Sequence, residues 1–242
     1  MKAHINVYAL NNTNIDSASL RVLGSLAHPL TDPGEYVADV VQGEINVGTF
    51  RLKVDPDCTS MQADVDLSKY DTKPKVLPPS VERRYSVAPK GYLLLFVSEG
   101  KGGFHVILNE IAAGKSAREK VARRYDTRSL EPGDVFIAQL LRPGIYEMTN
   151  SLGKAKGRIS IPYPKPLAKP LFQKEPEKIS LRDDKFSPDH VELENLQAAV
   201  FMNGMDHAAI QVALQEADYG KEKVKPEGTA FRWMNPSGKP AK

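Results

Sequence analysis

Residues 131–161 read EPGDVFIAQLLRPGIYEMTNSLGKAKGRISI, and this stretch has the densest strand and turn signals in the chain. The pairs Pro132-Gly133 and Pro143-Gly144 are typical of tight turns, because proline fixes φ and glycine accepts positive φ. Between and after the turns lie three apolar or alternating runs, at 135–141, 145–150 and 158–161. Apolar β-branched residues with a period of two are typical of strands. The pattern predicts three consecutive antiparallel strands.

The order of these signals is Pro-Gly-Asp, an apolar strand, Pro-Gly-Ile-Tyr-Glu, a loop, and then Lys-Gly-Arg-Ile-Ser-Ile. It resembles the last strands of cupredoxin-like β-sandwiches, and the resemblance implies such a domain at 81–161. In the copper-binding members a cysteine ends the second strand and a histidine follows, because a blue-copper centre needs thiolate and imidazole ligands. In this chain Thr149 or Asn150 stands at the cysteine position, and residues 151–157 contain neither histidine nor methionine. The resemblance therefore implies a domain without the copper site.

Length and composition are those of an ordinary globular protein. The chain has 242 residues, a formal net charge of +3 and 41% hydrophobic residues, enough for one large domain or two small ones. No apolar run approaches the roughly 18 residues of a membrane-spanning helix. The first residues show no secretory signal, and the single cysteine, Cys58, cannot form an intrachain disulfide. We therefore expect a cytoplasmic protein.

Strand signals also dominate the N-terminal third. Residues 4–10 are expected to form a strand, and 45–54 alternates Phe50, Leu52 and Val54 with charged residues. We predict an N-terminal β-rich domain at 1–72, a Pro-rich linker at 73–80 and a β-sandwich domain at 81–161. Similar Pro-Gly-acidic openings at 32–35 and 131–134 raise the hypothesis that the two domains are related.

Beyond residue 161 the composition changes. Five prolines within 162–176 predict an extended Pro-rich arm at 162–186. Ser187-Pro188 is a favourable helix start, and apolar residues spaced by three and four predict a C-terminal α-helix at 187–220, followed by a flexible tail at 221–242. The predicted fold class is mainly β, with antiparallel β-sandwich modules followed by the arm and the helix.

The arm, helix and tail carry large apolar side chains that a free linker rarely has. We predict that these side chains bind protein partners, either further copies of the chain or different subunits. The predicted partner-binding residues are Tyr163, Leu167, Leu171, Phe172, Leu193, Leu196, Val200, Ile210, Leu214 and Trp233.

The middle third is basic, with 14 Lys and Arg against 8 Asp and Glu in residues 81–160. After an expected strand, Gly114-Lys115-Ser116 precedes the helix-capable segment 117–125, in the order of a phosphate-binding loop, although the first glycine of that motif is missing. The candidate anion-binding residues are Lys115, Ser116, Arg118, Arg123 and Arg124. Solvated surface charge and contact with a nucleic-acid backbone are the competing interpretations.

Met202, Met205 and His207 are a candidate site for a soft metal such as Cu(I), although methionines at helical spacing are usually core residues. No cofactor is predicted. The five histidines are far apart in sequence, and neither a zinc-binding HExxH motif nor a G-x-S-x-G nucleophile motif occurs. The sequence therefore favours a non-catalytic structural or assembly subunit of a larger complex. The alternative is a ligand- or metal-binding accessory subunit with an anion bound at the basic region 101–128.

Overall fold

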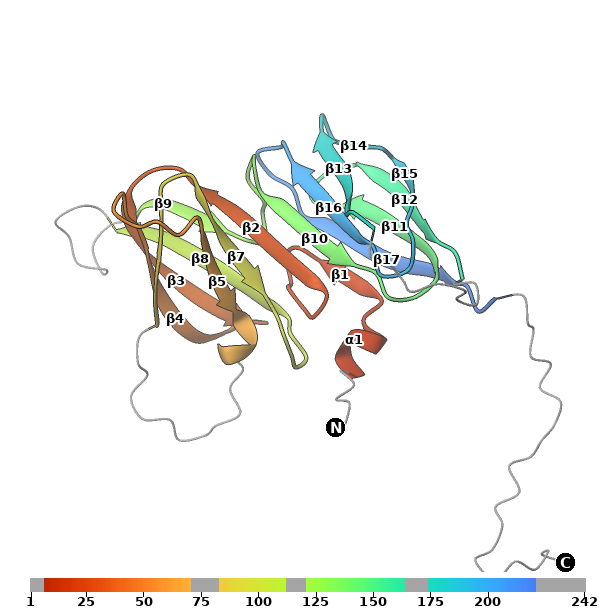
Figure 1. Ribbon diagram of the computed structural model, residues 1–242, viewed down its shortest axis with the longest axis horizontal. Coiled ribbons are helices and arrows are strands. Elements are labelled where there is room, and N and C mark those ends of the chain that lie inside the picture. The colour runs from red at the N-terminus through yellow and green to blue at the C-terminus, as the bar shows by residue number, and fades with distance from the viewer. Residues whose placement is uncertain (1–6, 71–82, 112–120, 164–173, 221–242) are drawn as a thin grey trace, which may run out of the picture.

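The structure is a computed structural model that describes residues 7–70, 83–111, 121–163 and 174–220. The described residues form three β-sheets, one short helix, α1 (Val7–Asn11), and one 3-10 turn, η1 (Leu67–Tyr70). The sheets are stacked in two lobes that lie side by side, and the longest sheet extends through both lobes (Figure 1).

Hydrogen bonding between neighbouring strands defines the order within each sheet. The seven-stranded sheet contains β14 (Lys185–Ser187), β13 (Glu177–Arg182), β16 (Ala198–Asn203), β10 (Val135–Gln139), β2 (Gly24–Leu30), β7 (Gly91–Phe96) and β5 (Gln62–Asp66). One five-stranded sheet contains β6 (Arg83–Val87), β4 (Ile45–Val54), β3 (Gly34–Gln42), β8 (Phe104–Ile111) and β9 (Val121–Asp126). The other contains β15 (His190–Glu192), β12 (Lys156–Ile161), β11 (Gly144–Asn150), β17 (Ile210–Ala217) and β1 (Asn14–Asp16).

The two lobes are structural repeats of one another. The order β6-β4-β3-β8-β9 in one five-stranded sheet corresponds strand by strand to β15-β12-β11-β17-β1 in the other. In the long sheet, β5-β7-β2 corresponds to β13-β16-β10. The directions agree as well, because β4–β6, β12–β15, β5–β7 and β13–β16 are parallel while the other corresponding pairs are antiparallel. We call β2–β9 the first repeat, and β10–β17 with β1 the second repeat.

A sequence signature accompanies the repeat. Asp16-Ser17-Ala18-Ser19-Leu20 corresponds to Asp126-Thr127-Arg128-Ser129-Leu130, and the Pro-Gly pair before β3 corresponds to the pair before β11. The hydrogen bonds correspond too. The Leu20 amide donates to the Phe104 carbonyl and the Leu130 amide to the Ala208 carbonyl, both at 2.7 Å. The Pro-Gly turn at 32–34 therefore matches the turn at 142–144 and not the one at 131–134.

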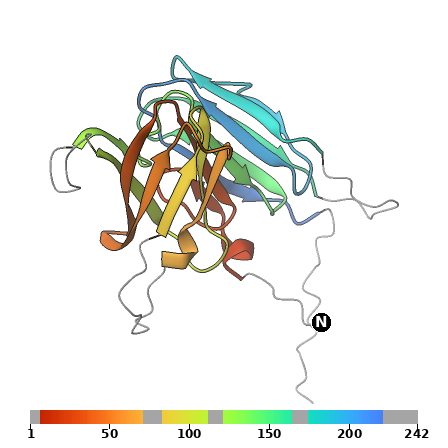
Figure 2. The ribbon, with the colours of Figure 1, turned by 60° about the vertical axis from the view of Figure 1, so that its left-hand side comes forward.

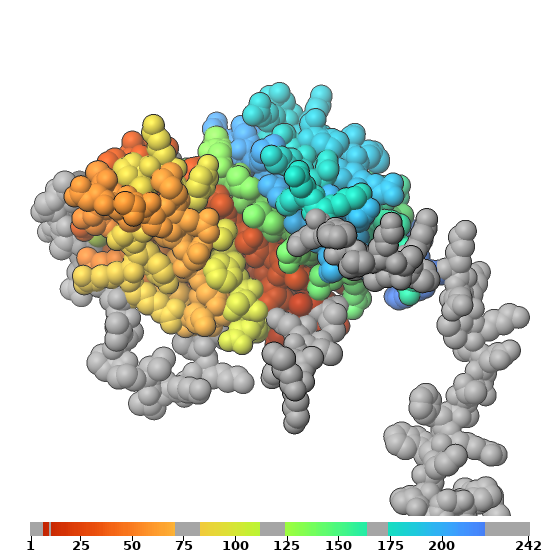
Figure 3. Space-filling view, in the orientation of Figure 1, coloured from red at the N-terminus to blue at the C-terminus, as the bar shows by residue number. Residues whose placement is uncertain are grey.

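At each of these signature segments the chain crosses from one repeat to the other. Ser17 bonds to Ile210 of the second repeat, and three residues later Leu20 bonds to Phe104 of the first. Thr127 and Leu130 make the reverse change, from Val106 of the first repeat to Ala208 of the second. As a result β1, at the start of the chain, completes the sheet that the last strand, β17, belongs to. The red N-terminal part of the chain that contains β1 lies between the lobes (Figure 3).

A pseudo-two-fold axis relates the repeats and passes between β2 and β10. These strands pair antiparallel with Leu26 opposite Phe136, and these two residues occupy equivalent positions in their repeats. Alternation of period two buries one face of β2 and of β11, and the buried apolar residues form a continuous core across both lobes. Figure 2, turned toward the first repeat, shows that repeat in front of the second.

The predicted C-terminal helix at 187–220 is wrong. That segment forms β15, β16 and β17, so the chain is a stack of β-sheets rather than sandwich modules followed by an arm and a helix. Ile210 and Leu214 lie on one face of a helix and also on one face of a strand, because a spacing of four fits both periods. Pairing of β16 with β10 and β13, and of β17 with β11, decides in favour of strands.

Three further expectations need correction. The predicted arm at 162–186 ends earlier than expected, because β13 begins at Glu177, directly after the last proline of the arm, and β14 follows it. The strand expected at 4–10 is replaced by α1 from Val7, and the helix-capable 117–125 contains β9 from Val121. Of the three consecutive strands predicted within 131–161, β11 and β12 are paired neighbours, but β10 belongs to the long sheet.

Strands on both sides of the predicted linker 73–80 pair with each other, β3 with β8 and β2 with β7. The strand expected at 45–54 is confirmed as β4 with the same bounds.

The cupredoxin-like resemblance stays a prediction. Asn150, at the expected cysteine position, is buried, and its side-chain oxygen accepts the amides of Leu152 and Ala209.

Candidate functional site

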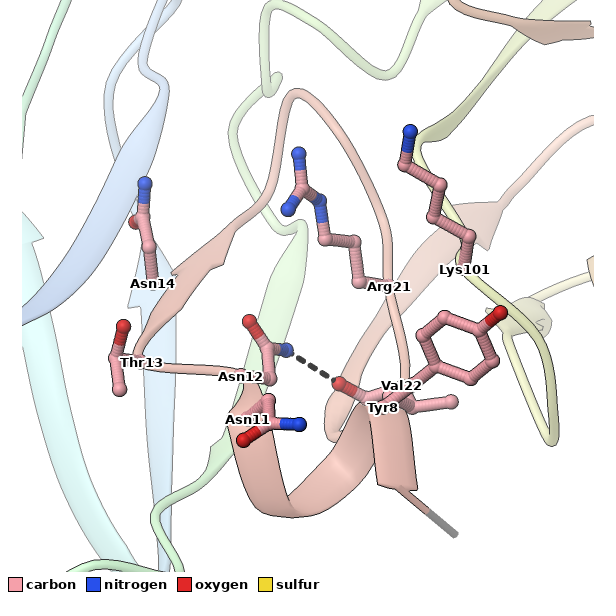
Figure 4. A pocket seen from close by; sticks show the side chains of 8 residues that line it. All are labelled: Tyr8, Asn11, Asn12, Thr13, Asn14, Arg21, Val22 and Lys101. Carbon is pink, nitrogen blue, oxygen red and sulfur yellow. Dashed lines mark hydrogen bonds between the residues drawn. The ribbon is translucent and has the colours of Figure 1, made fainter.

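A cavity lies beside α1; most of its lining residues carry a polar group, while apolar atoms make up most of the lining surface. It has a volume of about 290 Å³ and is lined by Tyr8, Asn11, Asn12, Thr13, Asn14, Arg21, Val22 and Lys101. Figure 4 shows that α1 and the segment after it form one wall, while Arg21 and Lys101 come from two separate loops. We call this cavity the α1 pocket. Its lining offers two cations, three amides and two hydroxyls, a set that can bind an anion and hydroxyl groups but holds no general base.

The backbone fixes the two cationic loops of the α1 pocket against each other. Leu20 and Phe104 exchange two backbone hydrogen bonds, and the Gly103 amide also donates to the Leu20 carbonyl. Gly102 has a φ of +70°, and a Cβ at this position would lie 2.6 Å from Cα of Arg21. Only glycine permits both the conformation and the close approach. Lys101 is therefore held next to Arg21 by the fold.

A cluster of polar side chains is buried where the two repeats meet. Asp134 is fully buried, and its Oδ1 accepts a hydrogen bond from Nδ1 of His28 at 2.7 Å. Its Oδ2 accepts from the hydroxyl of Tyr125 at 2.9 Å and from the amide of Glu131 at 2.7 Å. The rings of His28 and Tyr125 stack with centroids 3.7 Å apart. We call His28, Tyr125 and Asp134 the junction triad.

The junction triad borders a small cavity. Its volume of about 20 Å³ is enough for about one water molecule and too small for a substrate. Burial, and secondly the charge of Asp134, raise the pKa of Tyr125 well above its ordinary value of 10.0. Tyr125 therefore remains a hydrogen-bond donor. With all its donors directed at Asp134, the triad holds the two repeats together and presents no nucleophile.

An acidic groove lies at the far end of the second repeat. It has a volume of about 430 Å³ and is lined by Gly144, Ile145, Ser160, Ile161, Pro162, Glu192, Glu216, Ala217 and Asp218. Glu192 and Glu216 are exposed, and no hydrogen bond or ion pair of either side chain is found in the described part of the chain. The groove lining combines apolar residues with carboxylates. Such a surface suits a basic segment with apolar side chains.

The predicted anion-binding residues can be placed only in part. Lys115, Ser116 and Arg118 lie outside the described residues, as does the side chain of Arg123. Arg124 is exposed on β9. The residues that do gather positive charge around a cavity, Arg21 and Lys101, come from positions 80 residues apart in sequence, as the cavity lining shows. Their proximity depends on the Leu20–Phe104 bridge, which no local pattern predicts.

The predicted metal ligands differ in their surroundings. Met202 is exposed on β16, while Met205 packs against the hydrophobic core. Nδ1 of His207 lies 3.0 Å from the hydroxyl of Ser129, and His207 is exposed. Among the described residues no group of three or more His, Cys, Asp or Glu side chains is arranged to hold a metal ion.

The predicted partner-binding residues fall into four groups. Leu193 and Ile210 are fully buried core residues, so they are not available to a partner, and Val200 and Leu214 are partly buried. Tyr163 and Leu196 are exposed. Leu167, Leu171, Phe172 and Trp233 lie outside the described residues.

No local sequence pattern marks the junction triad, because His28 lies 106 residues before Asp134 in the chain. The signal that could have found Asp134 is the repeat itself, since the equivalent position in the first repeat is Gly24.

Comparison of the chain with protein-family models, with curated proteins and with solved structures gave no match. In the part of the chain that is described, no helix has the length and hydropathy to cross a membrane.

Proposed function

We propose that the protein is a non-catalytic assembly subunit that binds neighbouring subunits through one corner of its second repeat. The observation that carries this proposal is that the arm and the tail leave the fold at the same corner. Gly144 on β11 pairs with Ile161 at the end of β12 on one side and with Ala217 at the end of β17 on the other. The acidic groove lies between these strand ends.

Local contacts fix the starting points of the two segments relative to each other. The Tyr163 amide donates to Oδ2 of Asp218 at 3.2 Å, and the Gly220 amide donates to Oδ1 of the same carboxylate at 2.8 Å. Gly220 has a φ of +78°, and a Cβ there would lie 3.2 Å from the Tyr163 ring. Asp218 therefore ties the beginning of the arm to the beginning of the tail.

Charge complementarity favours a second copy of this chain as the partner. The tail, residues 221–242, contains six Lys and Arg against two Glu, together with Phe231, Trp233 and Met234. The acidic groove offers the opposite charge and apolar lining residues. Twenty-two extended residues span up to roughly 75 Å, which is enough to reach a neighbouring subunit. The tail of one copy in the groove of the next would give a chain-like or closed assembly.

The interior of the described fold supports a non-catalytic role. Three of its buried polar side chains, Asp134, Asn150 and Asn203, each make several hydrogen bonds to backbone or side-chain groups that hold loops and sheets in place. Fully bonded polar groups in a core specify the fold rather than react with a substrate. A cytoplasmic location with protein partners belongs to the same proposal.

The test is the mass of the full-length protein in solution, measured by light scattering over a range of concentrations. We expect an oligomer that dissociates when residues 221–242 are deleted and also in Glu192→Gln/Glu216→Gln. A matched control, Glu177→Gln, removes a carboxylate from β13 and should leave the mass unchanged. A full-length protein that is monomeric at every concentration would contradict the proposal.

The deletion must begin after Gly220. Removal of everything beyond residue 161 would delete five strands of the fold, so loss of assembly would then only report unfolding. The circular dichroism spectrum of each variant should match that of the intact protein. High salt should also dissociate the oligomer, because exposed charges are screened within about 10 Å at 0.1 M salt.

The alternative function, a ligand-binding accessory subunit, is favoured by one specific observation. Lys101, at the start of the basic region, lines the α1 pocket together with Arg21. Stoichiometric binding of a small ligand by a protein that stays monomeric would favour this alternative.

A further inference from the structure

The α1 pocket contains two cations that the fold itself does not require. Within the described residues, neither the side chain of Arg21 nor that of Lys101 makes a hydrogen bond or an ion pair, and both residues are exposed. The carboxylate whose charge interacts with Arg21 is Asp16, and its Oδ1 already accepts the Ala18 amide. The lining of the pocket therefore contains two cations and no carboxylate.

The second repeat shows that the same backbone forms without these charges. The position equivalent to Arg21 is Glu131, and the position equivalent to Lys101, three residues before the Ala208 bridge, is Met205. There, Nδ2 of Asn203 donates to the carbonyls of Glu131 at 2.9 Å and Met205 at 2.8 Å and joins the two loops directly. In the first repeat the residue equivalent to Asn203 is the exposed Glu99. The cations therefore serve something other than folding.

The other walls of the α1 pocket provide groups that recognise hydroxyls. Asn14 and Thr13 can each donate and accept hydrogen bonds, while Asn11 offers its Nδ2 as a donor, because its Oδ1 accepts the Arg142 guanidinium at 3.5 Å. Figure 4 shows the three on the wall across from Arg21 and Lys101. Asn12 is committed to the fold, because its Nδ2 donates to the Val22 carbonyl at 2.7 Å. The ring of Tyr8, 52% exposed, adds an apolar surface.

We propose that the α1 pocket binds a small oxyanion ligand that carries hydroxyl groups, a class that sugar phosphates represent. Arg21 and Lys101 bind the oxyanion, since guanidinium and ammonium groups form charge-assisted hydrogen bonds with phosphate. Asn11, Thr13 and Asn14 bind the hydroxyls. The volume is at the lower end of the range for ligand pockets, about 300–1,000 Å³, and so restricts the ligand to a small molecule.

The experiment is calorimetric titration of the full-length protein with glucose 6-phosphate, inorganic phosphate and glucose at one fixed ionic strength. We expect glucose 6-phosphate to bind more tightly than phosphate, and glucose to bind least. Arg21→Gln and Lys101→Gln should each weaken the binding of glucose 6-phosphate by about tenfold, which corresponds to the loss of one charge-assisted bond. Both residues are exposed, so the variants should remain folded.

Two control variants locate the effect. Lys178→Gln removes an exposed cation from β13 in the second repeat and should not change binding. Arg124→Gln tests the basic surface of β9, and a loss of binding there comparable to that in Arg21→Gln would place the anion outside the pocket and overturn the proposal. The proposal would also be overturned if neither glucose 6-phosphate nor inorganic phosphate bound at about 10 mM, which we take as the weakest affinity worth testing. If phosphate and glucose 6-phosphate bind with equal affinity, the pocket binds the oxyanion but does not recognise hydroxyl groups, and that part of the proposal is refuted.

Discussion

The two repeats of this protein share a backbone but differ in where their polar side chains lie. Both use Asp, a buried Ser or Thr, and Leu at the strand crossovers, with the same hydrogen bonds. On one side of the pseudo-two-fold axis Gly24 pairs with Ala138 and packs against Ile15. On the other side Asp134 stands at the position equivalent to Gly24, His28 at that of Ala138 and Tyr125 at that of Ile15. The comparison separates residues that the shared fold needs from residues that only one repeat uses.

The same comparison applies to the loops that meet at Leu20 and Leu130. In the second repeat Asn203 closes them, whereas in the first repeat they carry Arg21 and Lys101 beside an open pocket. The acidic groove likewise belongs to the second repeat. A duplicated framework therefore presents a basic cavity near one end of its chain and an acidic groove near the other.

The largest expected effect is at the junction triad. Asp134→Ala leaves His28, Tyr125 and the Glu131 amide buried without their acceptor, and we expect unfolding to require about 3–5 kcal/mol less free energy. Urea denaturation followed by circular dichroism measures this loss. The triple variant Asp134→Ala/His28→Ala/Tyr125→Phe, which has the apolar character of the first repeat's side, should be more stable than the single variant, because the side-chain donors of His28 and Tyr125 are removed together with their acceptor and only the Glu131 amide stays unpaired. A loss below about 1 kcal/mol in Asp134→Ala would contradict a structural role for the triad.

A smaller and symmetric effect is expected at the crossovers. The hydroxyl of Ser17 accepts the Ile210 amide at 2.9 Å, and that of Thr127 accepts the Val106 amide at 3.0 Å. Ser17→Ala and Thr127→Val each leave a buried amide unpaired and should each reduce the unfolding free energy by about 1–3 kcal/mol. Ser19→Ala is the matched control, because its hydroxyl makes no hydrogen bond within the described chain. A large loss at only one of the two crossovers would break the equivalence of the repeats.

The smallest effect is a difference in pH dependence. His105 on β8 is equivalent to Ala209 in the second repeat, and burial first and the charge of Arg128 second lower its pKa below the ordinary value of 6.5, while Asp126 opposes them. A histidine with a lowered pKa binds fewer protons in the folded state, so its contribution is complete above pH 6.5 and is lost as the pH falls through the folded pKa. His105→Ala should therefore show a smaller decrease in urea midpoint than the intact protein between about pH 7.5 and 5.5. Identical decreases in both proteins would exclude this role of His105.

The sequence by itself determined the β-rich character and several strands. The alternation at 45–54 and the Pro-Gly turns around 135–150 are local patterns, and β4, β10 and β11 lie where these patterns place them. They are readable because a period of two and the φ preferences of proline and glycine are properties of neighbouring residues.

Only the tertiary structure decided which strands share a sheet, why residues 198–217 form strands, and which polar side chains meet. Pairing partners such as β16 and β10, or the triad residues His28 and Asp134, are brought together by hydrogen bonds between distant segments. A spacing of four residues fits the face of a helix and of a strand alike, so the sequence leaves the choice open until a neighbouring strand satisfies the backbone. The α1 pocket has the same origin, because the Leu20–Phe104 bridge places Arg21 beside Lys101.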